Sequence, residues 1–459
     1  MGHLFYRPED AFTADVIPYW EDGVFHLFYL KEYRGENRKE YGEGIAWHKI
    51  TTKDFVHFED RGEMIPRGTI EEQDICIFTG SIIKAENVYH IFYTGFNWTF
   101  GEKGKPQQAV MHAVSHDSEQ WTKIPEHTFF ADSEKYEPHD FRDPFVFWNE
   151  ETNRYEMLLV SRKKDSGHTS GFTARYASND LVTWTDEGDF WAPALFHTHE
   201  CPDLFKMGDW WYMIYSEYSD KNITRYIMSK SINGPWVMPV DDAFDGRAYY
   251  AAKSVCDNEK RYLFGWLPTK INNIDWEGWM WGGNLVVHEI YPREDGTLAC
   301  RMPESLKKTW KAVSTHEDVT AANTSGKSDV LLFPETGSTY RLDAVLEYAE
   351  GARSFGLEVG YNHNEKKGYK FEFFPGEKLF KWDSVAQMIN SKDVTRPFTT
   401  GANQSILISI IKNEDMCVMY VNDEYALSTR MYDIAGRDIS FFAVGGSAQI
   451  KNAELFERL

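Results

Sequence analysis

The sequence predicts an all-β protein that combines a five-bladed β-propeller with a C-terminal β-sandwich. Three observations carry this prediction: a strand pattern that recurs five times, a second pattern that recurs in phase with it, and a different alternation after residue 307. Aromatic residues make up 16% of the chain, which suits many short strands because aromatic side chains are enriched in them. A chain of 459 residues is also too long for one ordinary core, so two domains are expected.

The first pattern marks one strand in each predicted blade. Its five copies are GVFHLFY, NVYHIFY, NRYEMLL, GDWWYMIY and EKRYLFGW, at residues 23–29, 87–93, 153–159, 208–215 and 259–266. Each copy begins with a turn residue or a charge and continues with alternating aromatic and aliphatic residues, as the second strand of a hairpin does. The copies lie roughly 50 to 65 residues apart, the spacing of four-stranded propeller blades with long loops.

The second pattern consists of a strand, a turn with Ser or Thr and Asp or Asn, and an aromatic residue. It occurs at residues 47–58, 112–121, 175–184 and 227–236. Two registers that repeat in phase predict a propeller over residues 1–305. Beyond it, segments such as TYRLDAVLEY and MCVMYVND alternate with period two and lack the repeat. This change predicts a Lys-rich linker at 306–318 and a β-sandwich at 319–459.

Composition argues against several classes of function. The formal charge of −22 repels nucleic acid and phosphate-rich partners, so a neutral substrate is expected, although solubility alone explains the charge equally well. The cysteines form no CxxC pair, so neither a zinc site nor a disulfide framework is indicated, and no metal or cofactor is expected. They are Cys76, Cys201, Cys256, Cys300 and Cys417.

Targeting signals are absent from the sequence as it stands. The N-terminus has no basic start followed by an apolar run, and no segment is long and apolar enough to span a bilayer. We therefore expect a cytoplasmic protein without a membrane partner, or an extracellular one if a signal peptide has been removed.

The repeat also places acidic residues. The first strand of each blade lines the central axis of a propeller, and the matching positions there hold Asp15, Ser81, Asp143, Glu200 and Tyr250. Three of these five residues are acids that point to one cavity, although like charges packed together raise one another's pKa and cost stability. A glycosidase uses such a group, since one carboxylate attacks the anomeric carbon and a second donates a proton to the leaving oxygen. A cation site or solvated loop acids are the alternatives.

Neighbouring residues suggest which acid does what. Arg142 is expected to keep Asp143 ionised, which suits a permanent anion. Glu200 lies beside the Cys201 thiol in an otherwise apolar stretch, which favours a raised pKa and a role as proton donor. Asp15 is then, by elimination, the nucleophile.

Four motifs in a fixed order make the chain similar to a known family. They are FTGS at 78–81, RDP at 142–144, ECPD at 200–203 and YYA at 249–251. With them, nearly the whole chain resembles glycoside hydrolase family 32, the invertase, inulinase and levanase group, whose members pair a five-bladed propeller with a β-sandwich. RDP alone is a weak signal, whereas RDP followed by ECPD at blade spacing is specific.

The resemblance implies a retaining hydrolysis of terminal β-fructofuranosyl residues, with no metal and no cofactor. It implies that Asp15 forms a fructosyl-enzyme intermediate, that Glu200 is the general acid and base, and that Asp143 stabilises the transition state. The Asp15 and Glu200 carboxyls are then expected roughly 5 to 5.5 Å apart. Residues implied to bind the sugar, with His199 added as a neighbour of the acids, are Trp47, Phe78, Ser81, Arg142, His199, Tyr250 and Trp266.

One motif departs from the family. The family usually reads WMNDPNG and then HLFYQ, whereas this chain reads FTADVIPYW and HLFYL. Asp15 is kept, but amide side chains are replaced by Ala14, the 16–17 region and Leu30. This predicts a more apolar pocket mouth, suited to an unusual fructoside, a fructan end or another furanoside such as an arabinoside.

Other candidate residues have a structural alternative. His139 and His199 adjoin the acidic motifs and are candidates to hydrogen-bond a carboxylate or the substrate. Phe96, Trp98 and Phe100 are expected to form either a platform for a second sugar or part of the blade packing. The run WEGWMWGG at 276–283 is expected to form either a loop over the pocket or a part of the core.

Three functions follow from these residues. The first is a retaining fructoside or fructan hydrolase. The second is another furanosidase, or an inverting hydrolase on the same five-bladed fold, and the third is a carbohydrate-binding propeller without activity. In each case the partner is a small carbohydrate, and the sandwich is the candidate site for contacts in a homo-oligomer.

Overall fold

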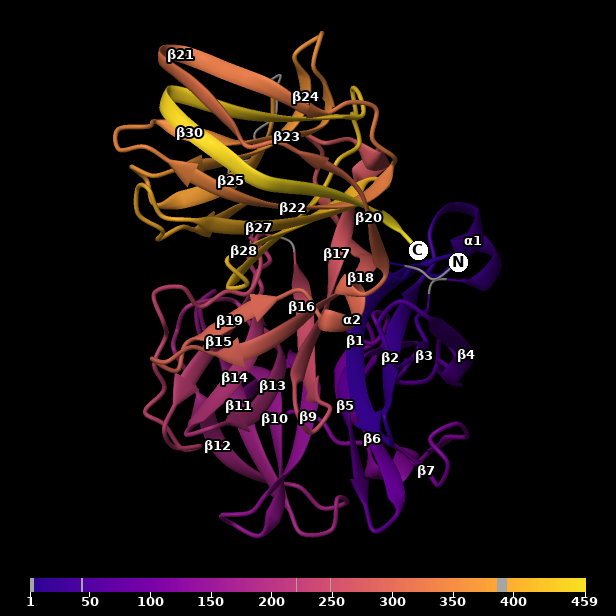
Figure 1. Ribbon diagram of the computed structural model, residues 1–459. Helices are drawn as coiled ribbons and strands as arrows, with labels where there is room; N and C mark the ends of the chain where they lie inside the picture. Colours follow the sequence, from indigo (N-terminus) through magenta and orange to yellow (C-terminus); the bar gives the residue numbers. More distant parts are fainter. Residues whose placement is uncertain (1–3, 43, 220, 248, 386–393) are drawn as a thin grey trace.

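The computed structural model consists almost entirely of β-strands (Figure 1). It describes residues 4–42, 44–219, 221–247, 249–385 and 394–459, so the first three residues of the predicted propeller lie outside it. The short helical segments within this part are α1 (Gly35–Tyr41), η1 (Pro125–His127), η2 (Ile271–Asn273) and α2 (Glu304–Lys307).

The strands between Phe12 and Arg301 form five antiparallel blades, as predicted. The first blade contains β1 (Phe12–Glu21), β2 (Val24–Glu32), β3 (Trp47–Thr52) and β4 (Phe58–Ile65). The second contains β5 (Cys76–Ala85), β6 (Val88–Phe96), β7 (Gln108–Ser115) and β8 (Thr122–Lys123). The third contains β9 (Tyr136–Asn149), β10 (Arg154–Lys163), β11 (Gly171–Ser178) and β12 (Thr185–Trp191).

The last two blades complete the ring. The fourth contains β13 (His199–Met207), β14 (Trp210–Glu217) and β15 (Thr224–Ser229). The fifth contains β16 (Tyr250–Cys256), β17 (Arg261–Lys270), β18 (Trp279–Pro292) and β19 (Leu298–Arg301). A pairing of Thr13 in β1 with Gly283 in β18 links this blade to the first. Each first strand also contacts the first strand of the next blade, and β16 contacts β1, so the ring is closed.

The repeats in the sequence correspond to equivalent strands. The five copies of the first pattern become the second strands of the hairpins, namely β2, β6, β10, β14 and β17. The four copies of the second pattern supply the third strands β3, β7, β11 and β15. The predicted propeller is therefore confirmed at the level of individual strands.

The C-terminal part is a β-sandwich that lies above the propeller in Figure 1. Its paired strands follow the order β26-β25-β24-β23-β30-β22-β27-β28-β29, with β20 and β21 also paired to β30. Their bounds are β20 (Trp310–His316), β21 (Val319–Phe333), β22 (Thr339–Tyr348), β23 (Ser354–Asn362), β24 (Lys367–Phe374), β25 (Leu379–Ser384), β26 (Thr395–Pro397), β27 (Ile406–Asn413), β28 (Met416–Val421), β29 (Tyr425–Arg430) and β30 (Asp438–Arg458).

The segment expected to be a linker, 306–318, carries regular structure. It includes the end of α2 and all of β20, which pairs with β30 of the sandwich. Strand β20 therefore belongs to the sandwich sheet, while the domain boundaries themselves stay a prediction.

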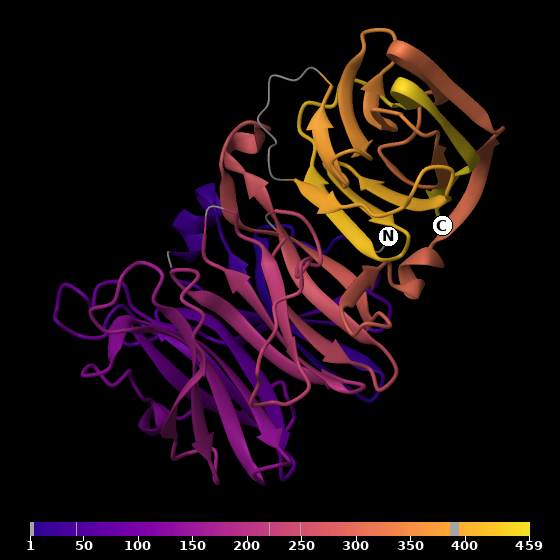
Figure 2. The same ribbon diagram turned by 90° about the vertical axis from the view of Figure 1, so that its left-hand side faces the viewer.

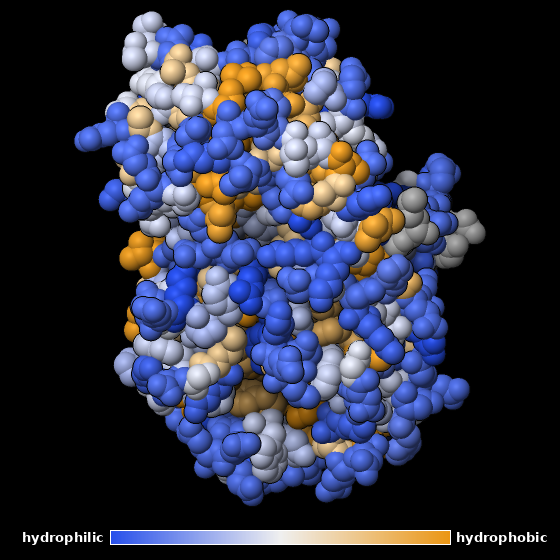
Figure 3. All heavy atoms as spheres, in the orientation of Figure 1, coloured by the Kyte–Doolittle hydropathy of each residue, from blue (hydrophilic) through white to orange (hydrophobic). Residues whose placement is uncertain are grey.

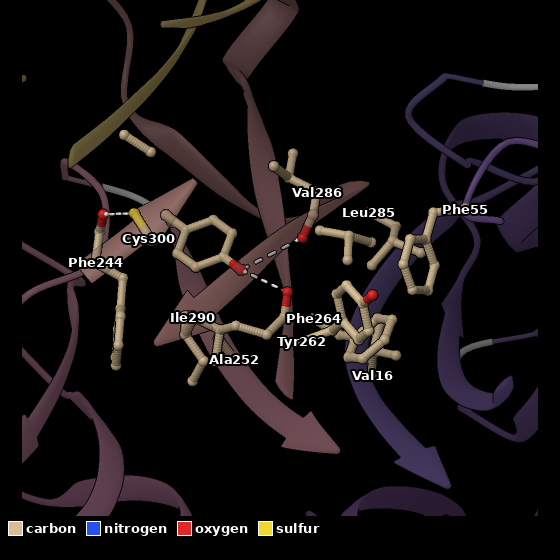
Figure 4. Packing of buried hydrophobic residues seen from close by; sticks show 14 of the residues in the cluster. Val16, Phe55, Phe244, Ala252, Tyr262, Phe264, Leu285, Val286, Ile290 and Cys300 are labelled. Carbon is tan, nitrogen blue, oxygen red and sulfur yellow. Dashed lines mark hydrogen bonds between the residues drawn. The ribbon is translucent and has the colours of Figure 1, made fainter. Parts of the chain in front are cut away.

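A continuous hydrophobic core runs from the propeller into the sandwich. Buried side chains of the fifth blade pack with Val418 and Tyr420 of β28 in one cluster. Figure 4 shows the propeller side of this cluster, in which Cys300 donates to the carbonyl of Phe244. The two domains are therefore packed through a shared core.

Hydrophilic residues cover most of the face seen in Figure 3, in agreement with the charge of −22.

A buried polar network crosses the same junction. Asp245 of the propeller accepts hydrogen bonds from the backbone N–H and the hydroxyl of Ser428 in the sandwich. The ring of His288 lies 3.0 Å from Asp245 Oδ2 and 3.0 Å from the Tyr420 hydroxyl. Burial raises the pKa of Asp245, but the contacts with His288 and Ser428 outweigh burial and hold this pKa below its ordinary value. A satisfied network of this kind fixes one relative placement of the two domains.

Candidate active site

A cavity of about 590 Å³ opens between the first strands of the blades. Its wall is contributed by all five first strands and by β17 and β18 of the fifth blade. The residues that line it are Asp15, Ile45, Phe78, Gln108, Asp140, Arg142, Asp143, His197, Glu200, Cys201, Tyr218, Asn222, Tyr250, Trp266, Pro268, Trp279, Met280 and Trp281. The three predicted catalytic acids are therefore brought together in one cavity.

A β-bulge at the same place in each first strand positions these side chains. The strand pairing shifts around Asp15, Thr79, Asp143, Cys201 and Ala251. Asp143, Cys201 and Ala251 have positive φ angles of 59°, 54° and 51°. A bulge re-aims its side chain relative to the regular pleat, and three of the bulge residues, Asp15, Asp143 and Cys201, line the cavity.

The bulges correct the alignment of the repeat by one residue in the fourth and fifth blades and by two residues in the second. The residues just before the shift are Ala14, Phe78, Arg142, Glu200 and Tyr250. Glu200 is thus equivalent to Arg142 and Tyr250, and not to Asp143. In the second blade the equivalent of Asp15 is Thr79, so the assignment of Ser81 to this position was wrong. The convergence of the acids on one cavity is unaffected.

Asp15 is held by two donors. Trp266 Nε1 donates to Asp15 Oδ1 over 3.0 Å, and the Thr79 hydroxyl donates to Oδ2. The pKa of Asp15 is raised to about 6. Desolvation is the main cause, the hydrogen bond from Thr79 opposes it, and the nearby charge of Asp143 adds to it. Its carboxylate is therefore fixed in direction and is ionised above about pH 6.

Asp143 is the most enclosed of the three acids, with 3% of its surface exposed. Its Oδ2 accepts the backbone N–H of Cys201 over 2.9 Å. Burial raises the pKa of Asp143, Arg142 lowers it and Glu200 raises it, and the net direction is upward. The Arg142 charge thus favours the ionised form of Asp143, although burial outweighs it, and the guanidinium forms its hydrogen bonds with Asp140, Thr198 and Glu200.

Glu200 lies in a polar setting. Its Oε1 accepts Arg142 Nη2 over 2.7 Å and Nε over 3.1 Å, and its Oε2 accepts the Tyr250 hydroxyl over 2.5 Å. The apolar setting expected from its sequence neighbours was therefore wrong, since the partners come from the third and fifth blades. The neighbouring Cys201 thiol is buried, which raises its pKa well above the ordinary value and keeps it neutral.

Four of the predicted sugar-binding residues line the cavity, namely Phe78, Arg142, Tyr250 and Trp266. The other three do not belong to the described lining. Trp47 is buried behind Phe78 and donates its Nε1 to the Phe78 carbonyl over 3.1 Å. Ser81 is two residues beyond the bulge, and its hydroxyl accepts the backbone N–H of Val146 over 2.9 Å.

His199 points away from the cavity. Its ring is buried against Trp191, Phe196 and Tyr215, with ring centroids 4.8, 5.5 and 5.3 Å away. Desolvation lowers the pKa of His199 to about 4. Alternation along β13 sends neighbouring side chains to opposite faces, so a histidine next to Glu200 packs between blades rather than beside the substrate.

The departure from the family motif lies beneath the cavity. Ala14, Ile17 and Leu30 are buried and pack in one cluster with Trp47 and Trp266. None of the three lines the cavity as described, so the expected apolar mouth was wrong for these positions. They form an apolar support under the side chains that surround Asp15.

Several lining residues have no motif in the sequence. Asp140 lies two positions before Arg142 on β9, on the same face, and bonds to Arg142 over 2.8 Å and to Arg162 over 3.0 Å. His197, Tyr218 and Asn222 come from the fourth blade and the segment before it. Asp140 could have been predicted from strand alternation, because residues two apart on a strand share a face. No sequence pattern marks loop residues such as Tyr218 as part of the cavity.

The remaining aromatic candidates separate into two groups. Trp279, Met280 and Trp281 of the 276–283 run line the cavity. The Phe96 ring stacks on Phe78 with centroids 5.2 Å apart, behind the lining.

Within the described residues, no group of three or more His, Cys, Asp or Glu side chains is arranged to hold a metal ion. None of the helices there has the length and apolar character to cross a membrane.

Comparison with known proteins identifies relatives over most of the chain. The N-terminal domain of glycosyl hydrolases family 32 matches residues 7–287. A levanbiose-producing levanase of Bacillus subtilis (strain 168) is 26% identical over 405 residues, which is 76% of this chain and 68% of that protein. A sucrose-6-phosphate hydrolase of Escherichia coli is 23% identical over 475 residues, covering 95% of this chain and 90% of the relative.

Solved structures share the two-domain fold. The sucrose-6-phosphate hydrolase from Lactobacillus gasseri superimposes with a TM-score of 0.77 at 17% identity, over 100% of this chain and 93% of that one. The exo-inulinase from Aspergillus awamori superimposes with a TM-score of 0.78 at 16% identity, over 100% and 98% of the two chains. At this level of identity the likeness concerns the arrangement of propeller and sandwich.

Proposed function

The chain belongs to glycosyl hydrolase family 32, and from this premise we propose that it removes terminal β-fructofuranosyl residues from fructosides or fructo-oligosaccharides with retention of configuration. The observation that carries the proposal is the cavity that Asp15, Asp143 and Glu200 line together. The relatives described above are named for levan and for sucrose 6-phosphate as substrates. A pair of carboxylates, one as nucleophile and one as proton donor, is what retaining hydrolysis requires.

In the first step, Asp15 attacks the anomeric carbon of the fructosyl unit. The bond between Asp15 Oδ and that carbon forms while the glycosidic C–O bond breaks, and Glu200 gives its proton to the leaving oxygen. Thr79 and Trp266 fix both Asp15 oxygens, which keeps the attacking lone pair directed into the cavity. The products are a fructosyl-enzyme ester and the released alcohol.

In the second step, water replaces Asp15. Glu200, now a carboxylate, takes a proton from the water, whose oxygen attacks the anomeric carbon and releases Asp15. Arg142 and Tyr250 hold Glu200 at both oxygens, which suits the anionic state of this step. Two inversions give net retention.

Asp143 supports both transition states. One of its oxygens is occupied by the Cys201 N–H, which leaves the other for the hydroxyls of the sugar. Its charge interacts with those of Asp15 and Glu200, so Asp143 lies where it can stabilise the positive charge that develops on the sugar ring.

The proposed function is tested by product analysis. The purified protein is incubated with sucrose, levan, inulin, short fructo-oligosaccharides and aryl arabinofuranosides, and the monosaccharides released are identified. Fructose is expected as the only one, and the anomer that appears first by NMR is expected to be β-fructofuranose. Release of arabinose, or first appearance of the inverted anomer, would contradict the proposal and favour the related furanosidases.

The pH dependence of activity follows from Asp15. Since the pKa of Asp15 is raised to about 6, kcat/KM is expected to fall about tenfold per pH unit below that value. Thr79→Val removes a donor that favours the ionised form, so the acid limb should move to higher pH. A pH series of kcat/KM measures this shift. Thr173→Val, a buried threonine of the third blade without a described partner for its hydroxyl, should leave the profile in place.

A further inference from the structure

The segment 271–281 consists of the connection from β17 to β18 and the first residues of β18, and its residues Trp279, Met280 and Trp281 line the cavity. Its inner end is Trp281, whose ring centroid lies 6.4 Å from that of Trp266 and 6.2 Å from that of Phe78. Trp266 donates directly to Asp15. Trp281 therefore lies next to Trp266, the residue that donates a hydrogen bond to the proposed nucleophile Asp15.

The same segment leads from the acids to the solvent. Gly283 of β18 pairs with Thr13 next to the Asp15 bulge. Trp279 and Trp281 both line the cavity, and Trp279 lies further along β18 from Gly283, across an irregularity in the pairing with β17. Beyond it, Trp276 is 66% exposed. Two cavity-lining tryptophans and one exposed tryptophan thus follow one another along this segment.

The sandwich holds this segment in position. The buried carboxylate of Asp275, 5% exposed, accepts the backbone N–H groups of Tyr432 and Asp433 over 3.1 and 3.2 Å. It also accepts the hydroxyl of Tyr369 in β24. The Tyr432 hydroxyl in turn accepts the backbone N–H of Lys270 over 3.2 Å. Strands β17 and β18 accordingly extend to the sandwich in Figures 1 and 2.

The opposite side of the mouth has matching chemistry. Tyr218 lines the cavity and is 54% exposed, and Asn222 and Asp140 supply polar groups beside it. Aromatic faces that bind the apolar side of a sugar ring, with a few polar groups for its hydroxyls, are typical of a carbohydrate site. On the side of β18, the exposed Trp276 precedes the lining residue Trp279 by three positions, within the segment that the sandwich holds.

We propose that the 271–281 segment is the binding wall for the leaving-group sugars of an oligosaccharide, and that the sandwich keeps this wall in place through Asp275. The inference rests on the proposed function, because it assigns the cavity bottom to the fructosyl unit and the tryptophan series to the units behind it. It makes a chain of several sugars, rather than a disaccharide, the substrate that uses the whole site.

The direct test is the dependence of kcat/KM on chain length. Fructo-oligosaccharides of increasing length are compared with the shortest fructoside that the wild type cleaves. Trp276→Ala is expected to lower kcat/KM for the long substrates about 3- to 10-fold, the size of one lost aromatic contact, and to leave the shortest substrate unchanged. Trp148→Ala, which removes a tryptophan that is 43% exposed on the third blade, should change neither value.

The result that overturns the proposal is an unchanged ratio between long and short substrates in Trp276→Ala. A wild-type protein that releases fructose from none of them would contradict the proposed function instead. Calorimetric titration of the Asp15→Asn variant with the same oligosaccharides separates the two cases, because affinity that rises with chain length and falls with Trp276→Ala needs no turnover.

The role of the sandwich is tested at Tyr369. Tyr369→Phe removes one donor to Asp275 and keeps the buried ring. It is expected to raise KM for the long substrates several-fold while kcat and the values for the shortest substrate stay unchanged. Tyr340→Phe is the matched control, since Tyr340 is also buried in the sandwich and its hydroxyl has no described partner. An equal loss on all substrates would show a purely structural role and contradict the proposal.

Discussion

Replacing Asp15 with asparagine is expected to lower kcat on the order of 10⁴-fold or more, because the fructosyl-enzyme ester cannot form without this nucleophile. The asparagine fits the site: its amide oxygen can accept Trp266 Nε1, and its NH₂ group can donate to the Thr79 hydroxyl. Turnover on the best substrate from the product analysis measures the loss. A variant that retains more than a hundredth of the wild-type kcat would remove Asp15 from the nucleophile role.

The same variant should be more stable than the wild type. Desolvation and the charges of Asp143 and Glu200 together raise the pKa of Asp15, so the ionised form above pH 6 is disfavoured by folding. A neutral amide removes this cost, and the thermal midpoint at pH 7.5 is expected to rise. At pH 4.5, where Asp15 is already protonated in the folded protein, the gain should largely disappear. Loss of activity with gained stability distinguishes a removed catalytic charge from a damaged fold.

The propeller could be predicted from the sequence because each blade contains its own antiparallel hairpin, whose strand pattern is encoded locally. The aromatic and aliphatic alternation of the second strand is local and repeats with every blade. The bulge in the first strand is not visible in this way, since Asp143 and Cys201 adopt positive φ angles without the glycine or asparagine that usually signals them. The repeat was therefore aligned one residue away from its true register in the fourth and fifth blades, and two residues away in the second.

The environment of each acid was predicted less well than its position. Sequence neighbours suggested that Glu200 lies in an apolar setting, whereas its carboxylate is bound by polar groups from other blades. The partners of Glu200 are Arg142 from β9 and Tyr250 from β16, which only the closed ring brings together. The hold of the sandwich on Asp275 is equally non-local, since Tyr369 is far along the chain.

Two acids share the stretch ECPD, and the structure separates their roles. Glu200 lines the cavity, whereas Asp203 is buried away from the described lining. Asp203 Oδ2 accepts the backbone N–H of Ser254 over 2.7 Å and its hydroxyl over 2.5 Å. Asp203 therefore ties the fourth blade to the fifth, and only Glu200 can reach a bound sugar.

Glu200→Gln is expected to lower kcat on oligosaccharides about 10³-fold, the usual contribution of a general acid and base, with little change in substrate affinity. An aryl fructoside with an acidic phenol needs no protonation, so its first step should survive and give a burst of phenol. The fructosyl-enzyme then accumulates because water lacks its base, and azide, which needs none, should restore turnover and yield β-fructosyl azide. Asp203→Asn should reduce thermal stability without a burst or azide rescue. If azide rescues neither variant, or rescues Asp203→Asn alone, the proton transfer does not belong to Glu200.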